Sequence, residues 1–185
     1  MVELKHPRQI KVWEPLFLFV AITMLIIYAI NALNTQDWLW FASKTVDATP
    51  DRIVIWHDGE QRLIQPGHDD FIELARAANV SLSRFSNTDL IHVDFNEETE
   101  AFYAQHGTLV TFFYDNPLDF HAPFRTGKPT QLAVPVNGRH AGYDYFFRGD
   151  KGVWWFGAMR MADSGPLLRT LAELGYVDTA VPASN

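Results

Sequence analysis

Four histidines of this chain lie beside acidic residues, and histidine and carboxylate side chains are common metal ligands. The pairs are His57 with Asp58, His68 with Asp69 and Asp70, His92 with Asp94, and His121 with Asp119. A metal site that can be read from sequence needs a diagnostic spacing, such as HExxH or two histidines four residues apart on a helix. None of these pairs has such a spacing, and turn or helix-cap roles account for His57, His68 and their aspartates. The sequence predicts no metal site.

Motifs for nucleophilic catalysis and phosphate binding are missing. The serine with the smallest neighbours, Ser164 in Ala162–Pro166, lies outside a GxSxG pattern and is expected to cap a helix. The glycines match neither a phosphate-binding loop nor a dinucleotide-binding turn. The absence of cysteine excludes disulfides, thiol nucleophiles, thiolate metal sites and covalently attached c-type haem. No catalytic residue and no cofactor is predicted.

The densest chemical signal is aromatic. The stretch Tyr143–Gly157, YDYFFRGDKGVWWFG, holds seven aromatic residues around an Arg-Gly-Asp centre. Neighbours in a strand point to opposite faces, so one residue of each adjacent aromatic pair must face away from the main core. Either another segment of the chain or a partner protein covers that second face. The candidate partner-binding residues are Tyr145, Phe146, Phe147, Trp154 and Trp155.

The Arg-Gly-Asp centre itself is interpreted as turn chemistry between two strands. Arg148, Asp150 and Lys151 are expected to stay in water, because turns are rich in such residues.

Alternating hydrophobic and helical patterns predict the elements around this hairpin. Strands are expected at 53–56, 61–65, 90–95, 108–115 and 131–136, with the first two joined as a hairpin by the turn His57–Glu60. Helices are expected after Asp69 or Asp70, which would cap the first of them, after Asn96, and after Ser164. A loop rich in proline and glycine, residues 116–129, is the longest irregular stretch.

Most neighbouring strands are linked by hairpins, so the fold class is α+β: an antiparallel sheet covered by helices. A hairpin followed by a helix occurs near each end of this domain. The pattern fits a duplicated ββα unit or two independent units, and the sequence leaves the two open.

An apolar run near the N-terminus predicts a membrane span. Leu16–Leu33 is 18 residues long without a charge, and at about 1.5 Å per residue it crosses most of a bilayer's hydrocarbon core. Trp13 precedes the run, and Trp38 and Trp40 follow it, where indole rings favour the membrane interface. The run exceeds the usual length of a cleaved signal peptide, so a retained signal anchor is expected.

Basic residues set the expected orientation. Lys5, Arg8 and Lys11 precede the run, and Lys44 lies among Asp37 and Asp47 after it, so the N-terminus is predicted to be cytoplasmic. The predicted organisation is a cytoplasmic segment (1–14), a transmembrane helix (15–35), an interfacial segment and linker (36–51) and an extracytoplasmic domain (52–185). An exported domain without cysteine favours a bacterial cell.

Charge excludes some partners. The chain from Lys44 onward carries 12 basic and 19 acidic residues, which accounts for the whole net charge of −7. Nucleic acids and anionic lipid surfaces both require a basic face, so neither is an expected partner of this domain. The bilayer, through residues 15–35, and other membrane-protein subunits are the expected partners.

The short basic segment KHPRQIKVWEP, one anchor helix and an acidic α+β domain together resemble, in layout, single-pass accessory subunits of bacterial respiratory or photosynthetic electron-transfer complexes such as alternative complex III. The resemblance carries no motif and so assigns no functional residue. It implies a non-catalytic accessory or assembly subunit in the cell membrane, whose periplasmic domain docks on a partner. An extracytoplasmic ligand-binding or sensing module, and a hydrolase with a dispersed site, are the alternatives.

Overall fold

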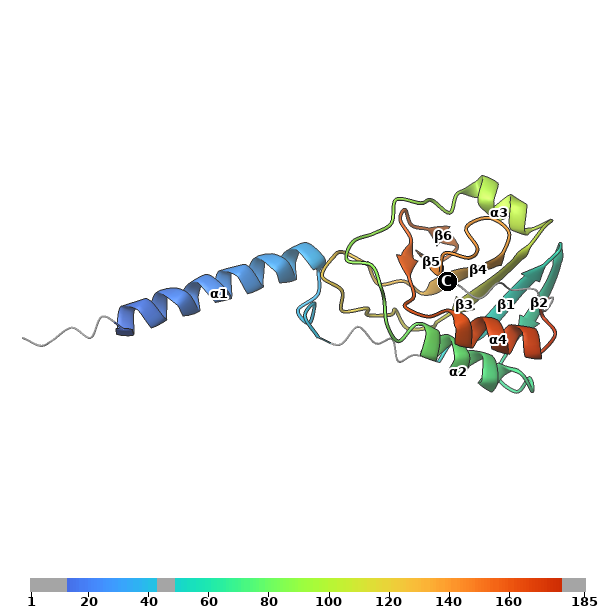
Figure 1. The fold of residues 1–185 in the computed structure, drawn as a ribbon, viewed down its shortest axis with the longest axis horizontal. Coiled ribbons are helices and arrows are strands. Elements are labelled where there is room, and N and C mark those ends of the chain that lie inside the picture. The colour runs from blue at the N-terminus through green and yellow to red at the C-terminus, as the bar shows by residue number, and fades with distance from the viewer. Residues whose placement is uncertain (1–12, 43–48, 178–185) are drawn as a thin grey trace, which may run out of the picture.

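A single long helix stands away from a mixed domain in this chain (Figure 1). The computed structural model describes residues 13–42 and 49–177. The helix, α1, spans Trp13–Thr35, close to the predicted 15–35. Several predictions concern residues outside the described ranges: the basic residues Lys5, Arg8 and Lys11 before the helix, Lys44 and Asp47 after it, and residues 178–185 of the predicted domain.

Helix α1 is long and apolar enough to cross a membrane. Its best 18-residue window has a mean hydropathy of 2.5, and only 6% of that window is buried against the rest of the chain. By length and composition it fits a membrane anchor or a signal sequence. A core helix of a water-soluble domain would instead bury its apolar side chains.

The domain is built on one seven-stranded antiparallel sheet, and this confirms the predicted α+β class. The strand order is β2-β1-β3-β4-β5-β6, with β7 paired to β5 beside β6. The strands are β1 (Arg52–His57), β2 (Glu60–Ile64), β3 (Thr108–Phe113), β4 (Gln131–Asn137), β5 (Tyr145–Asp150), β6 (Val153–Trp154) and β7 (Met159–Arg160). The helices are α2 (Phe71–Ser81), α3 (Glu97–Tyr103) and α4 (Gly165–Glu173).

One face of the sheet is covered by α2 and α4, which lie side by side (Figure 1). Alternation places Ile53, Ile55, Val110, Phe112 and Phe146 on this face, all of them fully buried. The apolar stripes of α2 and α4 close this main core with Leu74, Ala78, Leu167 and Leu171. Each such side chain contributes about 1.5–3 kcal/mol on burial.

The opposite face carries a smaller core beneath α3 and the extended segment 91–95. Phe95 and Tyr103 pack there against Leu109, Ala133 and Phe147. Helix α3 begins after Asn96 as predicted, and Asn96 caps it, because its Oδ1 accepts a hydrogen bond from the Thr99 N–H at 3.0 Å. Helix α3 is short, so it covers only part of this face.

Hairpin-then-helix order is present at both ends of the domain. The β1–β2 and β5–β6 hairpins lie at opposite edges of the sheet, while α2 and α4 share one face. Strand β7 intervenes between β6 and α4 and has no counterpart after β2. This arrangement leaves open whether the two units are a duplication.

The predicted strand at Leu90–Phe95 is wrong. This segment is extended, but its ladder contact is a single bridge, Ile91 with Ala158. Residues 85–91 lie beside the segment 158–161 that contains β7, and they form only two isolated bridges with it, Phe85 with Met161 and Ile91 with Ala158. Its apolar alternation arises because Phe95 is buried against the smaller core while the residues on either side of it are exposed.

Two predicted helix caps occupy the right positions but do not cap. Asp70 and Ser164 precede α2 and α4, yet neither side chain accepts a hydrogen bond from its helix. Asp70 accepts one from the Tyr176 hydroxyl at 2.6 Å instead, and Ser164 donates to Asp144. Both side chains therefore tie the helix starts to other segments of the domain.

The Arg-Gly-Asp prediction is also wrong, because these three residues belong to strand β5. The turn is Lys151-Gly152, with φ of 49° and 81°, as a tight two-residue hairpin requires. Gly149 is needed for packing, since a Cβ there would lie 2.4 Å from the Val153 carbonyl oxygen.

Arg148 is buried instead of lying in water. It is 2% exposed, and its guanidinium donates to the backbone carbonyls of Thr126, Phe156 and Gly157. No carboxylate among the described residues pairs with it. Burial lowers the pKa of Arg148 to about 10, so it remains charged at neutral pH.

Replacing Arg148 with Met should destabilise the domain by roughly 2–3 kcal/mol, because it leaves buried carbonyls without donors. Arg148→Lys should also destabilise, since an ammonium cannot reproduce the planar fork of donors. The measurement is denaturant unfolding of the full chain in detergent, followed by tryptophan fluorescence. Arg76→Met, on an exposed position of α2, is the control and should change little. If Arg148→Lys were as stable as the native chain, the stabilising role given to the Arg148 guanidinium would be contradicted.

His140 should make the domain less stable in acid. Its ring lies 5.5 Å from that of Phe147, and burial, then the charge of Arg139, lowers its pKa below the ordinary 6.5. Below that pH the unfolded chain binds more protons than the folded chain, so stability falls as pH decreases. His140→Gln should flatten the dependence of unfolding free energy on pH between about 7 and 5. An unchanged slope, equal to that of a His92→Gln control, would refute this role.

Candidate functional site at the junction of α1 and the domain

The predicted partner-binding residues divide by burial. Phe146 and Phe147 are both fully buried, on opposite faces of β5, so they are not accessible to a partner. Trp154 packs on Phe95 with ring centroids 5.0 Å apart, and Trp155 packs on Gly127. Tyr145, Trp154 and Trp155 are partly exposed. The second face of the hairpin is thus covered largely by the chain itself.

The exposed apolar residues of this segment flank the predicted ones. Tyr143 is 57% exposed and stacks on Tyr145, while Phe156 is 60% exposed and lies against His92. The accessible aromatic surface of 143–157 therefore consists of Tyr143 and Phe156 with the edges of Tyr145, Trp154 and Trp155.

Helix α1 ends in a specific turn that directs the chain toward the domain. Gln36 has a φ of 58°, and the Asp37 N–H reaches back to the Ala32 carbonyl at 3.2 Å, the bond pattern of a Schellman ending. Thr35 Oγ1 donates to the Asn31 carbonyl at 2.8 Å. Ala32 and Thr35 are the buried residues of α1, whereas most of the remaining helix is exposed.

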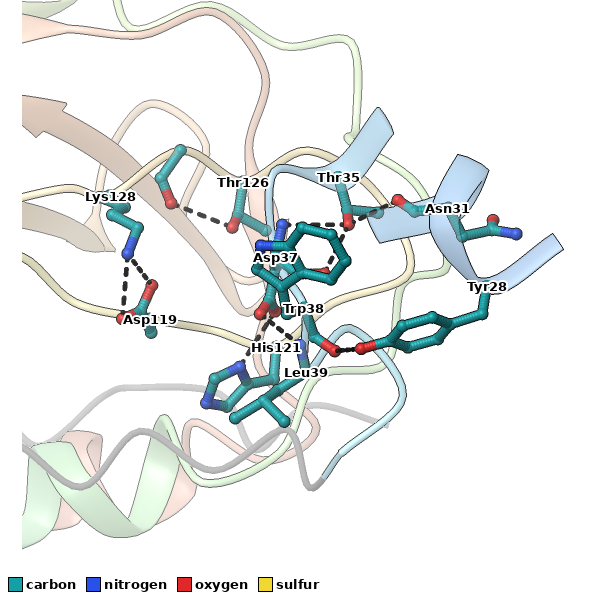
Figure 2. Close-up of polar contacts among 11 residues, drawn as sticks. Tyr28, Asn31, Thr35, Asp37, Trp38, Leu39, Asp119, His121, Thr126 and Lys128 are labelled. Atoms are coloured by element: carbon teal, nitrogen blue, oxygen red, sulfur yellow. Dashed lines mark hydrogen bonds and ion pairs between the residues drawn. The ribbon is translucent and has the colours of Figure 1, made fainter. Parts of the chain in front are cut away.

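Asp37 and His121 join this turn to the domain. The His121 Nδ1 lies 3.0 Å from the Asp37 Oδ2, and the two side chains are 25% and 20% exposed. Asp37 Oδ1 also accepts from the Leu39 N–H at 2.8 Å, which fixes the carboxylate. Figure 2 shows Asp37 and His121 pointing toward one another between the end of α1 and the loop that carries His121.

Aromatic residues surround the same turn. The Tyr28 hydroxyl donates to the Trp38 carbonyl at 2.8 Å (Figure 2). The Tyr28 ring contacts those of Trp38 and Phe41. Trp38 is 60% exposed and Trp13, at the other end of α1, is 79% exposed. Trp40 is partly buried, and its Nε1 has no partner among the described residues. Amphipathic rings therefore lie at both ends of α1, and their position at a membrane interface stays a prediction.

The β3–β4 loop, residues 114–130, holds His121 in place. Leu118, Phe120 and Ala122 are buried in the domain, and Phe120 packs between Phe85 and Phe146. His121, between two of these buried residues, points the other way, toward Asp37. Arg148 donates to the carbonyl of Thr126 in the same loop. A continuous set of contacts therefore runs from the sheet through Arg148 and the β3–β4 loop to α1.

Two of the histidine–acid pairs adjacent in sequence are in contact in the structure, His57 with Asp58 at 3.9 Å and His68 with Asp70 at 3.8 Å, whereas His121 has a different partner. His121 pairs with Asp37, while Asp119 pairs with Lys128 at 3.1 Å on the surface. In the described part of the chain, no group of three or more metal-ligating side chains comes together. The Asp37–His121 pair is called the clamp below, because these two partly shielded side chains bind one another and join the end of α1 to the β3–β4 loop.

Sequence reasoning missed Asp37, His121 and Thr35 as functional residues. The Asp37–His121 contact joins positions 84 residues apart, and no local spacing encodes such a contact. Two signals pointed toward it: a polar residue directly after the apolar helix, and an unusually long loop. Loops of this length in a compact domain often carry function.

Comparison of the chain with protein-family models, with curated proteins and with solved structures gives no match. The interpretation of the junction therefore depends on its geometry.

Breaking the clamp should loosen α1 relative to the domain. The chain lacks cysteine, so Leu25→Cys and Val80→Cys, both at exposed positions, give a unique spin-label pair. Pulsed electron–electron double resonance should report one narrow distribution of the distance between the two labels in the native background. The distribution should be broad with His121→Ala or Asp37→Asn. Asp119→Asn, which removes only an exposed ion pair, is the control and should leave the distribution narrow. A narrow distribution in all variants would show that the clamp is dispensable.

Proposed function

We propose that this protein is a non-catalytic, single-pass accessory or assembly subunit of a larger bacterial membrane complex. Its helix α1 packs in the bilayer beside partner helices, and its acidic domain, outside the cytoplasm, docks on the same partner.

The junction between α1 and the domain carries this proposal. Asp37–His121, the buried Ala32 and Thr35 and the anchored β3–β4 loop hold the domain in one orientation on the helix. Two binding surfaces joined rigidly engage a partner cooperatively when their geometry matches that partner. An enzyme that acts on diffusing substrates, or a module on a flexible tether, gains little from such a fixed placement.

The proposed orientation has α1 as a retained anchor with the N-terminus in the cytoplasm. Support comes from the sequence, with Lys5, Arg8 and Lys11 before the helix and a domain of net negative charge after it. An acidic domain is repelled by anionic lipid headgroups, so contacts with protein would hold it near the membrane.

The layout makes respiratory and photosynthetic electron-transfer complexes the first assemblies to test. Within such a complex this chain supplies contacts and not redox chemistry, because it has no cysteine and its described residues form no metal-ligand cluster.

Purification of the tagged full-length protein from its native membranes in mild detergent tests the proposal directly. The expected result is a stable multi-subunit assembly, identified by mass spectrometry, with an absorption spectrum that reports any chromophore in the partners. A monomer that copurifies with no other membrane protein would overturn the proposal.

Phe156→Ser should weaken capture of the partner without unfolding the domain, because this ring is 60% exposed in the accessible part of the aromatic segment. Ile72→Ser, at a position 68% exposed on α2, is the matched control and should capture normally. The readout is partner yield per mole of tagged chain, with thermal unfolding measured in parallel. Equal yields from both variants would exclude Phe156 from the docking surface.

A further inference from the structure

A cavity of about 400 Å³ opens on the sheet face that α3 covers only in part. It lies between α3 and strands β1 and β3, on the side of the sheet opposite α2 and α4. Its volume falls within the usual range for small-molecule sites. In Figure 1, α3 lies at the side of the domain away from α1, so the cavity is remote from the junction.

Aromatic side chains form most of the cavity wall. The rings that line it are Trp56, Phe95, Tyr103, Phe113 and Trp154. Phe95 and Tyr103 are buried and fix the inner wall, while the other three are partly exposed. The face of an aromatic ring is electronegative, so several rings around one space favour a cation carried on an apolar frame.

The charge of the residues that line the cavity also favours a cation. Glu100 is the one charged residue that lines the cavity, and it shares a side of α3 with Tyr103 and Ala104. No lysine, arginine or histidine lines it. Just outside, the Arg52 guanidinium lies 4.3 Å from the Phe113 ring centroid, so this row of rings already attracts one cation of the chain.

One hydroxyl group in the cavity lining is free to bind a ligand. Thr111 is 4% exposed and lines the cavity, and its side chain makes no hydrogen bond to any other residue within 13–42 and 49–177. The neighbouring Gln131 is already engaged, because its Oε1 accepts from the Gly152 N–H at 2.9 Å. Thr111 can therefore bind a polar group of a ligand whose apolar part lies among the rings.

We propose that this cavity binds a small soluble organic cation, a methylated or alkyl ammonium compound. The rings enclose its apolar carbon atoms, Glu100 balances its charge at the rim, and Thr111 binds a hydroxyl or other polar substituent. This inference is independent of the proposed docking function, since a chain that purifies alone can still bind such a ligand.

Isothermal titration of the full-length protein in maltoside detergent tests the site. The probes are choline and 3,3-dimethylbutan-1-ol, which have the same shape and differ in charge. Choline should bind at least about tenfold more tightly than the neutral probe, since a cation–π contact contributes on the order of 1–2 kcal/mol. Equal affinity for the two probes, or no measurable binding of choline, would overturn the proposal.

Two variants locate the binding within the cavity. Glu100→Gln should weaken choline binding by roughly tenfold, because it removes the one lining charge and leaves the shape unchanged. Glu97→Gln is the matched control, an equal charge change on the same exposed helix at a residue that does not line the cavity. The proposal fails if both variants lose affinity equally, because choline would then respond to net charge alone.

Discussion

The buried guanidinium of Arg148 is the constraint that organises the part of this domain that contacts α1. A charge in the interior costs free energy unless it is hydrogen-bonded. Here backbone carbonyls from two loops accept hydrogen bonds from Nη1 and Nη2, while Nε has no partner among the described residues. Each loop therefore has its conformation fixed by the same side chain. One of them carries Trp155 and Phe156 away from the sheet, and the other is the β3–β4 loop with His121. Because no carboxylate among the described residues neutralises Arg148, its position depends on backbone geometry and not on an ion pair.

The clamp between Asp37 and His121 connects α1 to the loop that Arg148 holds in place. A helix that leaves a membrane through a flexible linker gives its domain many orientations, whereas a helix ending that is capped, buried and bound to a fixed loop gives few. The Schellman turn at Gln36 and the hydrogen bonds of Asp37 supply the capped end. Phe120 and Ala122, buried on either side of His121, supply the fixed loop. This rigidity supports a role in which helix and domain meet one partner together.

Helices cover the two faces of the sheet to different extents. Paired helices complete the main core on one face, which accounts for the buried residues Ile53, Val110, Phe112 and Phe146. On the other face α3 is too short to cover the strands, and the aromatic residues Trp56, Phe113 and Trp154 remain partly open around a cavity. The aromatic segment 143–157 contributes to both faces, so its high aromatic content reflects packing first and surface second.

Sequence alone determined the features that depend on neighbours along the chain. The apolar helix, the hairpin at His57–Glu60, the helix that begins after Asn96 and the α+β class all follow from periodicity, turn residues or charge in the first helical turn, which act over a few residues. Tertiary structure decided what depends on distant partners. The residues next to Arg148 in sequence did not indicate that it is buried, because its hydrogen-bond acceptors are the carbonyls of residues 126, 156 and 157. Asp70 and Ser164 form hydrogen bonds with distant side chains instead of capping their helices, and Leu90–Phe95 forms a single bridge to Ala158 in place of a ladder. The pairing of Asp37 with His121 likewise exists only after folding, since 84 residues separate the two side chains.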